Sequence, residues 1–491
     1  MLFNSYEFIF LFLPVVLAGY YLVARLSPNG ASVWLALASL VFYGWWTPRF
    51  IPLLSISIAA NYSVGLALSR VPQSARKATL ITGLVFNLAL LGYYKYAGFL
   101  VSFADQVTGA SLPIPEILLP LGISFFTFTQ IAFLVDVYRG KAREYRPIHY
   151  VLFVTFFPHL IAGPILHHKE MMPQFARLSS YRLRSANFAV GLTIFAIGLA
   201  KKTVIADTLS PFVAQTFDAA SHGAIPGTFE AWGGALGYTL QLYFDFSGYS
   251  DMAIGLARLF GIKMPINFYS PYKADSIIEF WRRWHMTLSR FLRDYLYIPL
   301  GGNRHGTWRR YANVMVTMLL GGLWHGAGWT FVVWGGLHGC YLVFNHGWRA
   351  LHGSAPLSRP MLLAARLLTF LSVVFAWTVF RADSLAAAGR VVAGMVGASG
   401  AGWTLPSGHW DRGYSAIAVG LALIWLAPNT SEIMARYAPV LPFDRAVRSA
   451  REPGFTFRWR ATPSWAYAVS VVASLGLLYL SRIAEFLYFR F

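Results

Sequence analysis

Two histidines, each directly after a tryptophan, are the residues best suited to chemistry in this chain. His325 lies in a glycine-rich apolar segment, residues 314–329, where burying an imidazole is costly unless its polar atoms are satisfied. Because its pKa is about 6.5, an imidazole can remove the proton of a hydroxyl as that hydroxyl attacks a thioester. We therefore predict that His325 is the general base of an acyl transfer, or the transient acyl carrier of a double displacement.

The second histidine, His285, is expected on an amphipathic helix. Ser276, followed three residues later by Glu279, forms a capping box that predicts a helix beginning at Ile277. Apolar residues then recur at helical spacing as far as Tyr295, with charged residues mainly on the other side. His285 falls on or beside the apolar side, so it either bonds to the protein or is available to a bound molecule. In an active site it would orient a thioester or stabilise an oxyanion.

Basic and glycine-rich residues around His285 could hold an anionic group. Arg282 and Arg283 precede it closely, and a guanidinium matches a phosphate group bidentately. The glycine turn at residues 299–304, which contains Asn303, offers backbone donors to an anion. The residues predicted to bind the donor or the substrate are Trp281, Arg282, Arg283, Trp284, Asn303, Trp324 and Asp245.

Charged residues within apolar runs have structural as well as functional interpretations. Asp245 and Asp251 end an apolar run, and their spacing predicts a helix break near Gly248, with arginines as the structural partners of the carboxylates. Lys201 and Lys202 are expected near the end of a span, where lysines can extend toward water. Asp245 therefore has two open interpretations, a structural ion pair and a substrate contact.

Two further segments are unusual for a membrane span. His338, within the glycine-rich residues 334–340, is either a third member of the site or a packing residue. Residues 157–164 contain two prolines and a glycine, so we expect a broken, re-entrant segment there.

The composition identifies the class of protein. Of 491 residues, 56% are hydrophobic and 12% are charged, and the mean hydropathy is +0.51, so the apolar surface exceeds what a water-soluble core could bury. The 40 Lys and Arg against 20 Asp and Glu are typical of polytopic proteins, whose cytoplasmic loops collect basic residues. We therefore expect a lipid bilayer, and not nucleic acid, as the partner of this charge. The single cysteine, Cys340, excludes an intrachain disulfide and a cysteine-rich metal site.

Transmembrane helices must position these residues. We expect one membrane-embedded domain over residues 1–491, a catalytic core at 241–346 and a cytoplasmic excursion at 437–462. We expect the first apolar window to be a retained span of this domain and not a signal peptide. About eleven full spans are expected, with some of the apolar windows re-entrant. The windows lie near residues 7–24, 31–46, 50–69, 78–103, 117–137, 148–166, 187–207, 227–247, 311–325, 327–346, 361–380, 413–427 and 464–481.

Four motifs occur together in this chain: FPHLIAGP at 157–164, YFDFSGYSD at 243–251, WRRWH at 281–285 and GLWHG at 322–326. As a set they resemble the membrane-bound O-acyltransferase family. The chain is most similar to the bacterial alginate O-acetyltransferase branch of that family, which also ends in an aromatic segment like residues 486–491.

The resemblance implies an all-α polytopic membrane protein. In this fold a ring of about eleven tilted transmembrane helices, with re-entrant and interfacial helices, surrounds a central tunnel. The histidine matching His325 lies at the narrow point of the tunnel, and the residue matching His285 is the second active-site histidine.

The resemblance also implies a reaction. An acetyl group from cytoplasmic acetyl-CoA passes through the bacterial inner membrane for O-acetylation of an exported polysaccharide such as alginate, directly or through a periplasmic acetyltransferase partner protein. Acetyl-CoA is then a substrate, with no bound cofactor and no metal. One alternative is D-alanyl transfer to teichoic acid from a carrier protein. Another is a non-enzymatic transporter that uses His325 and Asp245 as proton or substrate sites, although no transporter-type repeat is visible.

Overall fold

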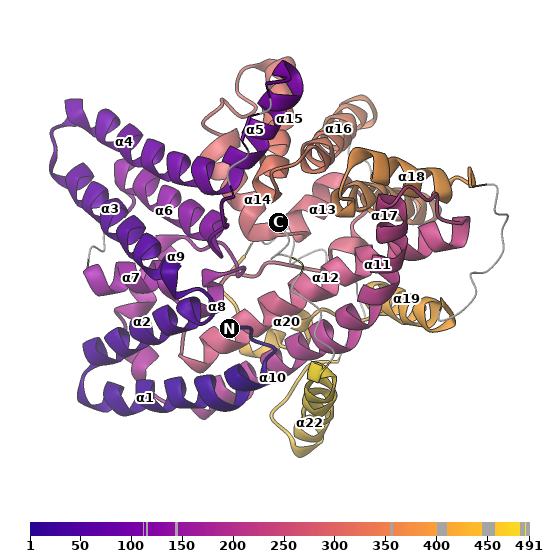
Figure 1. The fold of residues 1–491 in the computed structure, drawn as a ribbon. Helices are drawn as coiled ribbons and strands as arrows, with labels where there is room; N and C mark the ends of the chain where they lie inside the picture. Colours follow the sequence, from indigo (N-terminus) through magenta and orange to yellow (C-terminus); the bar gives the residue numbers. More distant parts are fainter. Residues whose placement is uncertain are drawn as a thin grey trace. The chain divides into compact units, whose positions relative to one another are not determined.

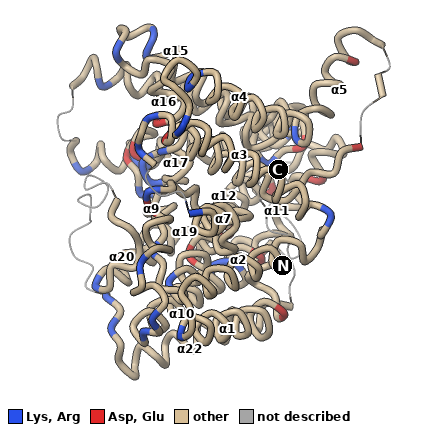
Figure 2. The backbone as a smooth tube through the Cα atoms, turned by 90° about the vertical axis from the view of Figure 1, so that its left-hand side faces the viewer, with Lys and Arg blue, Asp and Glu red and all other residues tan. Residues whose placement is uncertain are grey.

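The structure is a computed structural model that describes residues 1–110, 112–113, 116–142, 146–353, 357–399, 410–443, 457–481 and 487. Every regular element within these ranges is a helix, and none of them contains a strand (Figure 1). The predicted all-α fold is confirmed. Most of the tube in Figure 2 is uncharged, as expected for helices that face lipid or one another.

The chain packs as two compact units whose segments alternate along the sequence. The first unit contains Met1–Ala196, Tyr249–Ile266 and Met434–Pro442. Its helices are α1 (Leu13–Leu26), α2 (Pro28–Gly44), α3 (Ile51–Arg70), α4 (Gln73–Leu91), α5 (Ala97–Thr108), α6 (Ile123–Tyr138), α7 (Pro147–Thr155), α8 (Phe157–Leu160), α9 (His168–Phe175) and most of α10 (Ser185–Ala200), with the short helices η1 (Phe8–Phe12), η2 (Pro48–Phe50), η3 (Gly92–Tyr96), η4 (Leu178–Tyr181) and η8 (Ala435–Tyr437).

Phenylalanine rings and paired amides hold the first unit together. The buried rings of Phe8, Phe42 and Phe157 contact one another, with centroids 5.4 to 6.0 Å apart. Asn61 of α3 and Asn87 of α4 exchange side-chain hydrogen bonds of 3.2 and 2.6 Å, a polar contact typical of packed membrane helices. The interruption predicted at residues 157–164 is confirmed, because α7 ends before the four-residue α8. That this segment re-enters the membrane stays a prediction.

The second unit contains Ile197–Gly248, Asn267–Ile433 and Phe443–Phe491. It carries the residues that the sequence assigns to chemistry. Its helices are α11 (Asp207–Ser221), most of α12 (Thr228–Leu259), α13 (Ile277–Arg283), α14 (Met286–Leu292), α15 (Gly306–His325), α16 (Trp329–His352), α17 (Arg359–Arg381), α18 (Leu385–Met395), α19 (Trp410–Leu426), α20 (Thr430–Ile433) and α22 (Pro463–Leu478), with the short helices η5 (Lys201–Ala206), η6 (Pro271–Lys273), η7 (Arg293–Tyr297) and η9 (Tyr479–Ser481).

Helices α15 and α16 form a tightly packed antiparallel pair (Figure 1). Gly322 of α15 and Gly335 of α16 lie at their contact, where an added Cβ on either glycine would overlap backbone atoms of the opposite helix. Small residues allow membrane helices to approach this closely. Through this contact the end of α15, which carries His325, packs closely on the first turns of α16.

Six helical segments among the described residues are long and apolar enough to cross a membrane, which confirms a polytopic membrane protein. They are Phe8–Leu26, Pro48–Arg70, Gln73–Thr108, Ser185–Ser221, Arg359–Arg381 and Pro463–Ser481. Helices α12, α15 and α16 are also long, with 32, 20 and 24 residues, but their polar residues and glycines lower the hydropathy. The larger number of spans, the ring and the tunnel stay predictions.

The helix break predicted near Gly248 is wrong. Helix α12 continues through Asp245, Gly248 and Asp251 without interruption. Gly248 instead permits close packing, because an added Cβ would lie 2.7 Å from the backbone oxygen of Gly198. Because six residues do not make a whole number of α-helical turns, the two carboxylates lie on different sides of this helix.

The predicted domain organisation is only partly covered by the structure. The predicted core, residues 241–346, lies in the second unit except for residues 249–266, which belong to the first. Within the predicted excursion at 437–462, residues 444–456 lie outside the described residues, as do 486 and 488–491 of the aromatic terminus. The single domain and the excursion stay predictions.

Candidate active site

His285 lies at a break between two short helices. Helix α13 begins where the capping box predicts, and the Ser276 hydroxyl accepts a hydrogen bond from the Glu279 N–H (3.4 Å). The helix ends at Arg283, and α14 begins at Met286. The single continuous helix predicted for this stretch is therefore wrong.

Backbone hydrogen bonds from a distant segment explain the break. The Met286 N–H donates to the Asn267 carbonyl oxygen (2.9 Å), and the Tyr269 N–H donates to the Arg283 carbonyl oxygen (3.0 Å). Between these bonds, His285 adopts φ of 40°, in the left-handed region that non-glycine residues seldom occupy. Such a conformation costs about 1–3 kcal/mol and is concentrated at functional sites. The structure therefore constrains the orientation of this imidazole strongly.

The Asn267 side chain determines which nitrogen of the His285 ring carries the proton. His285 Nδ1 lies 3.1 Å from Asn267 Oδ1, which also accepts hydrogen bonds from the Thr287 hydroxyl (2.9 Å) and the Thr287 N–H (3.4 Å). Because a backbone N–H can only donate, the shared atom is an acceptor, and His285 Nδ1 must donate to it. In the neutral ring, Nε2 then carries the lone pair.

Burial keeps the His285 ring neutral. The residue is fully buried and lies outside the six candidate spans, and desolvation lowers its pKa to about 3. A neutral ring protonated on Nδ1 presents a lone pair at Nε2, so His285 is suited to accept a proton or a hydrogen bond. Stabilising an oxyanion would require a donor at that atom.

His325 is the last residue of α15 and is 7% exposed. Aromatic rings surround it, with centroid distances of 4.9 Å to Trp324, 5.1 Å to Trp334 and 5.3 Å to Phe380. The His285 and His325 centroids are 6.5 Å apart, and Trp324 contacts both rings. The structure thus brings together the two histidines that the sequence singles out, on elements far apart in the chain.

The two tryptophans of the WRRWH motif belong to the aromatic cluster near His338. The Trp281 indole N–H donates a hydrogen bond to His338 Nδ1 (3.2 Å). Trp284 is buried and lies 4.9 Å from Trp377 between ring centroids. Trp281 therefore contacts His338 directly, and Trp284 packs on Trp377, which contacts His338.

The two arginines of the motif share one carboxylate. Arg283 Nε lies 2.8 Å from Glu279 Oε1, and Arg282 Nη1 lies 3.5 Å from Glu279 Oε2. The Arg283 side chain is buried, whereas the Arg282 side chain is 52% exposed and accessible to a ligand. Asn303 is exposed in the turn after η7, where Gly301 and Gly302 have positive φ.

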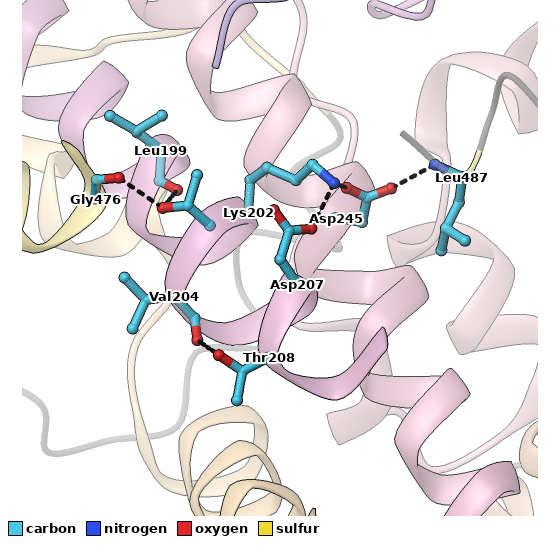
Figure 3. A network of polar contacts seen from close by, with 9 residues as sticks. Leu199, Lys202, Val204, Asp207, Thr208, Asp245, Gly476 and Leu487 are labelled. Carbon is cyan, nitrogen blue, oxygen red and sulfur yellow. Dashed lines mark hydrogen bonds and ion pairs between the residues drawn. The ribbon is translucent and has the colours of Figure 1, made fainter. Parts of the chain in front are cut away.

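Asp245 belongs to a buried ionic cluster (Figure 3). The Lys202 ammonium lies 2.9 Å from Asp245 Oδ1 and 2.7 Å from Asp207 Oδ1, and the Leu487 N–H donates to Asp245 Oδ2 (3.0 Å). The Lys202 side chain does not extend toward water, because the residue is 2% exposed and its ammonium is held by these two carboxylates. That Lys202 lies near the end of a span stays a prediction. The partner of Asp245 is also a lysine and not one of the arginines.

A family model described as the membrane-bound O-acyltransferase family (MBOAT) matches residues 49–384. The chain belongs to this family. The match includes both histidines, α12 to α16 and the Lys202 cluster apart from Leu487. As a member of the MBOAT family, the protein is a membrane-bound O-acyltransferase.

Three relatives illustrate the range within the family. The peptidoglycan O-acetyltransferase of Helicobacter pylori is 45% identical over 82% of this chain and 80% of its own length. A protein of Pseudomonas putida named "Probable alginate O-acetylase AlgI" is 39% identical over the full length of both chains. The teichoic acid D-alanyltransferase of Bacillus subtilis is 28% identical over 53% of this chain and 68% of its own length.

Several residues of the site were not identified from the sequence. Asn267 lies 18 residues before His285, in the segment between α12 and η6, and Trp334, Trp377 and Phe380 read as ordinary apolar residues of long helices. Only the fold brings them to the histidines. Within the described ranges, no group of three or more His, Cys, Asp and Glu side chains could hold a metal ion.

Proposed function

We propose that this O-acyltransferase passes an acetyl group from cytoplasmic acetyl-CoA through the bacterial inner membrane for O-acetylation of an exported polysaccharide such as alginate, directly or through a periplasmic acetyltransferase partner protein. The observation that carries the proposal is the contact between two buried imidazoles, His285 and His325. Proton transfer by a well-placed histidine accelerates such reactions by roughly 10²- to 10⁴-fold.

The chemistry assigns different tasks to the two histidines. His325 removes the proton of the acceptor hydroxyl as its oxygen forms a bond to the thioester carbon. The carbon–sulfur bond then breaks, and the proton passes from His325 to the departing thiolate. In the double-displacement version, His325 first carries the acetyl group itself. His285, with its lone pair on Nε2, accepts a hydrogen bond from the neighbouring His325 ring once that ring has taken up the proton, which replaces the oxyanion role expected from the sequence.

Basic residues at one end of the α15–α16 pair favour a phosphate-bearing donor. Arg310 at the start of α15 hydrogen-bonds to His346 Nδ1, and the Arg349 guanidinium donates to the Ser276 hydroxyl (3.1 Å). Arg310 and His325 are about 22 Å apart along the α15 axis. This separation suits acetyl-CoA, in which a long arm joins the phosphates to the thioester.

The names of the relatives support a polysaccharide acceptor. Two similar proteins act on peptidoglycan and alginate according to their names, and both of these are polymers of hydroxyl-bearing sugars. The D-alanyl alternative has weaker support, because its relative matches only about half of this chain. Peptidoglycan is therefore the second candidate acceptor.

The proposal can be tested with purified protein in lipid nanodiscs. Labelled acetyl-CoA is supplied with alginate oligosaccharides in one arm and peptidoglycan fragments in another, with and without a periplasmic acetyltransferase. We expect acetyl label on one of the two polymers. In a further arm that supplies carrier protein loaded with labelled D-alanine, we expect no label on either polymer. His222→Ala, which changes an exposed histidine directly after α11, is the matched control and should behave as the wild type. Transfer of D-alanine without transfer of acetyl would contradict the proposal.

A further inference from the structure

His338 of α16 is a buried histidine inside a cage of aromatic rings. Its exposed fraction is 0%. The ring centroids around it lie 4.8 to 6.1 Å away and belong to Phe280, Trp281, Trp334, Tyr341 and Trp377. Packing alone would be served better by an apolar ring, because a buried imidazole must satisfy two polar nitrogens.

The proton of the His338 ring can be assigned. The indole N–H of Trp281 is only a donor, so its 3.2 Å contact identifies His338 Nδ1 as the acceptor. In a neutral imidazole the proton must then be on Nε2. This is the opposite tautomer to that of His285, where Nδ1 carries the proton. The His338 ring therefore presents a donor, and the His285 ring presents an acceptor.

The Nε2 donor of His338 is unsatisfied within the described part of the chain. The atom is buried from solvent, and so is the indole N–H of Trp334, which likewise has no acceptor among those residues. The great majority of buried donors in native structures are satisfied, so an exception requires an explanation, of which a bound partner is one. A ligand carbonyl would complete the hydrogen bonds of this cage.

His338 lies one aromatic ring beyond the reaction centre. Trp334 contacts His325 on one side, with centroids 5.1 Å apart, and His338 on the other, at 4.8 Å. A ligand that has its reacting carbonyl beside His325 and extends past Trp334 would meet His338 with a group a few bonds away from that carbonyl. In a pantetheine thioester, an amide carbonyl follows the sulfur at such a spacing.

We propose that His338 Nε2–H donates a hydrogen bond to the amide carbonyl nearest the thioester sulfur of the acyl donor. The inference rests on the proposed function, since it assumes a pantetheine thioester. His338 is then a positioning residue that aligns the donor arm while the acyl carbon reacts at His325. Trp281 fixes the tautomer that makes this contact possible.

Two small donors separate this role from a structural one. S-acetyl-N-acetylcysteamine contains the amide, and S-propyl thioacetate has the same thioester without it. His338→Phe keeps an aromatic ring but removes the N–H, whereas His338→Gln keeps an N–H donor. We expect His338→Phe to lower kcat/KM for the amide donor about tenfold, the value of one well-formed hydrogen bond, and to change the amide-free donor little. His338→Gln should restore part of the loss.

Each alternative result has a clear meaning. Equal losses with both donors, or no loss with either, would overturn the assignment and leave His338 as a packing residue. Melting temperatures of the variants are measured in the same preparation. Trp281→Phe removes the indole N–H that keeps the His338 proton on Nε2, so it should weaken the preference for the amide donor without abolishing transfer. A wild-type protein that transfers acetyl from acetyl-CoA but shows no preference between the small donors contradicts only this inference. Transfer from none of the three donors contradicts the proposed function itself.

Discussion

Two buried polar regions of the second unit differ in how their polar atoms are satisfied. In the buried cluster of Lys202, Asp207 and Asp245, the lysine ammonium contacts both carboxylates, and the Leu487 N–H donates a hydrogen bond to Asp245. In the histidine site, neutral rings lie among aromatic side chains, and Asn267 and Trp281 fix which nitrogens carry protons. The first arrangement pairs opposite charges inside the protein, whereas the second contains neutral rings of opposite tautomer, with a lone pair on Nε2 of His285 and a proton on Nε2 of His338.

The largest contrast is expected from His325→Ala. Its removal should abolish O-acetylation of the polysaccharide in cells, by at least roughly 10²- to 10⁴-fold, because the general base or acyl carrier is lost. The variant should accumulate in the membrane at wild-type levels, because the close contact between α15 and α16 at Gly322 and Gly335 does not involve the His325 side chain. Esterification of the cell's polysaccharide can be measured by NMR after extraction. Normal acetylation in that strain would refute the role of His325.

Lys202→Met should have the reverse effect. Removing the ammonium leaves Asp207 and Asp245 buried without their cation, which should destabilise the protein by about 3–5 kcal/mol. Turnover per folded molecule should change little. Lys201→Met is the comparison, because it removes the neighbouring ammonium, which donates a hydrogen bond to the Thr430 hydroxyl (2.9 Å). Thermal unfolding in detergent would compare the two, and a large loss of turnover in stably folded Lys202→Met would place the cluster in the reaction.

A smaller effect is expected from Asn267→Ala. The variant removes the acceptor that holds the proton on His285 Nδ1, so kcat should fall about tenfold, the value of one hydrogen bond. Thr287→Val removes another bond to the same oxygen and leaves the His285 contact in place, so its kcat should fall less. Steady-state kinetics with acetyl-CoA would measure both, and equal effects would indicate a general loosening of the helix break.

The smallest effect is expected from Arg282→Gln. This exposed guanidinium is proposed to meet a phosphate of the donor, so KM for acetyl-CoA should rise roughly two- to fivefold, as for exposed ion pairs. KM for S-acetyl-N-acetylcysteamine, which has no phosphate, should stay the same. Arg293→Gln is the control, since Arg293 is also exposed and pairs with Asp294 (2.7 Å). A rise in KM for both donors would contradict the phosphate contact.

The sequence predicts local features of this protein well. Composition alone indicates a helical membrane protein, and the capping box at Ser276 gives the first residue of α13. His325 stands out because an ionisable residue in an apolar segment needs a reason. Each of these predictions depends on residues that are close together in the chain.

Features that depend on distant residues are not predictable in this way. The break at His285 depends on hydrogen bonds with Asn267, which accepts them, and with Tyr269, which donates one. The segment that contains these two residues has no periodic pattern of apolar residues. Lys202 and Asp207 are five residues apart and would not face each other on a regular α-helix, but the π-helical turn η5 brings them together. The aromatic cage around His338 likewise comes from three separate helices, α13, α16 and α17.

Single-turnover transfer by purified protein tests the central claim most directly. Wild-type protein, His325→Ala, His285→Ala and Lys201→Met are placed in lipid nanodiscs, matched for melting temperature, and mixed with labelled acetyl-CoA and an acceptor oligosaccharide. The account predicts rapid transfer by the wild type and by Lys201→Met. In both histidine variants, transfer should be slower by roughly 10²-fold or more. Transfer at the wild-type rate by folded His325→Ala would contradict it.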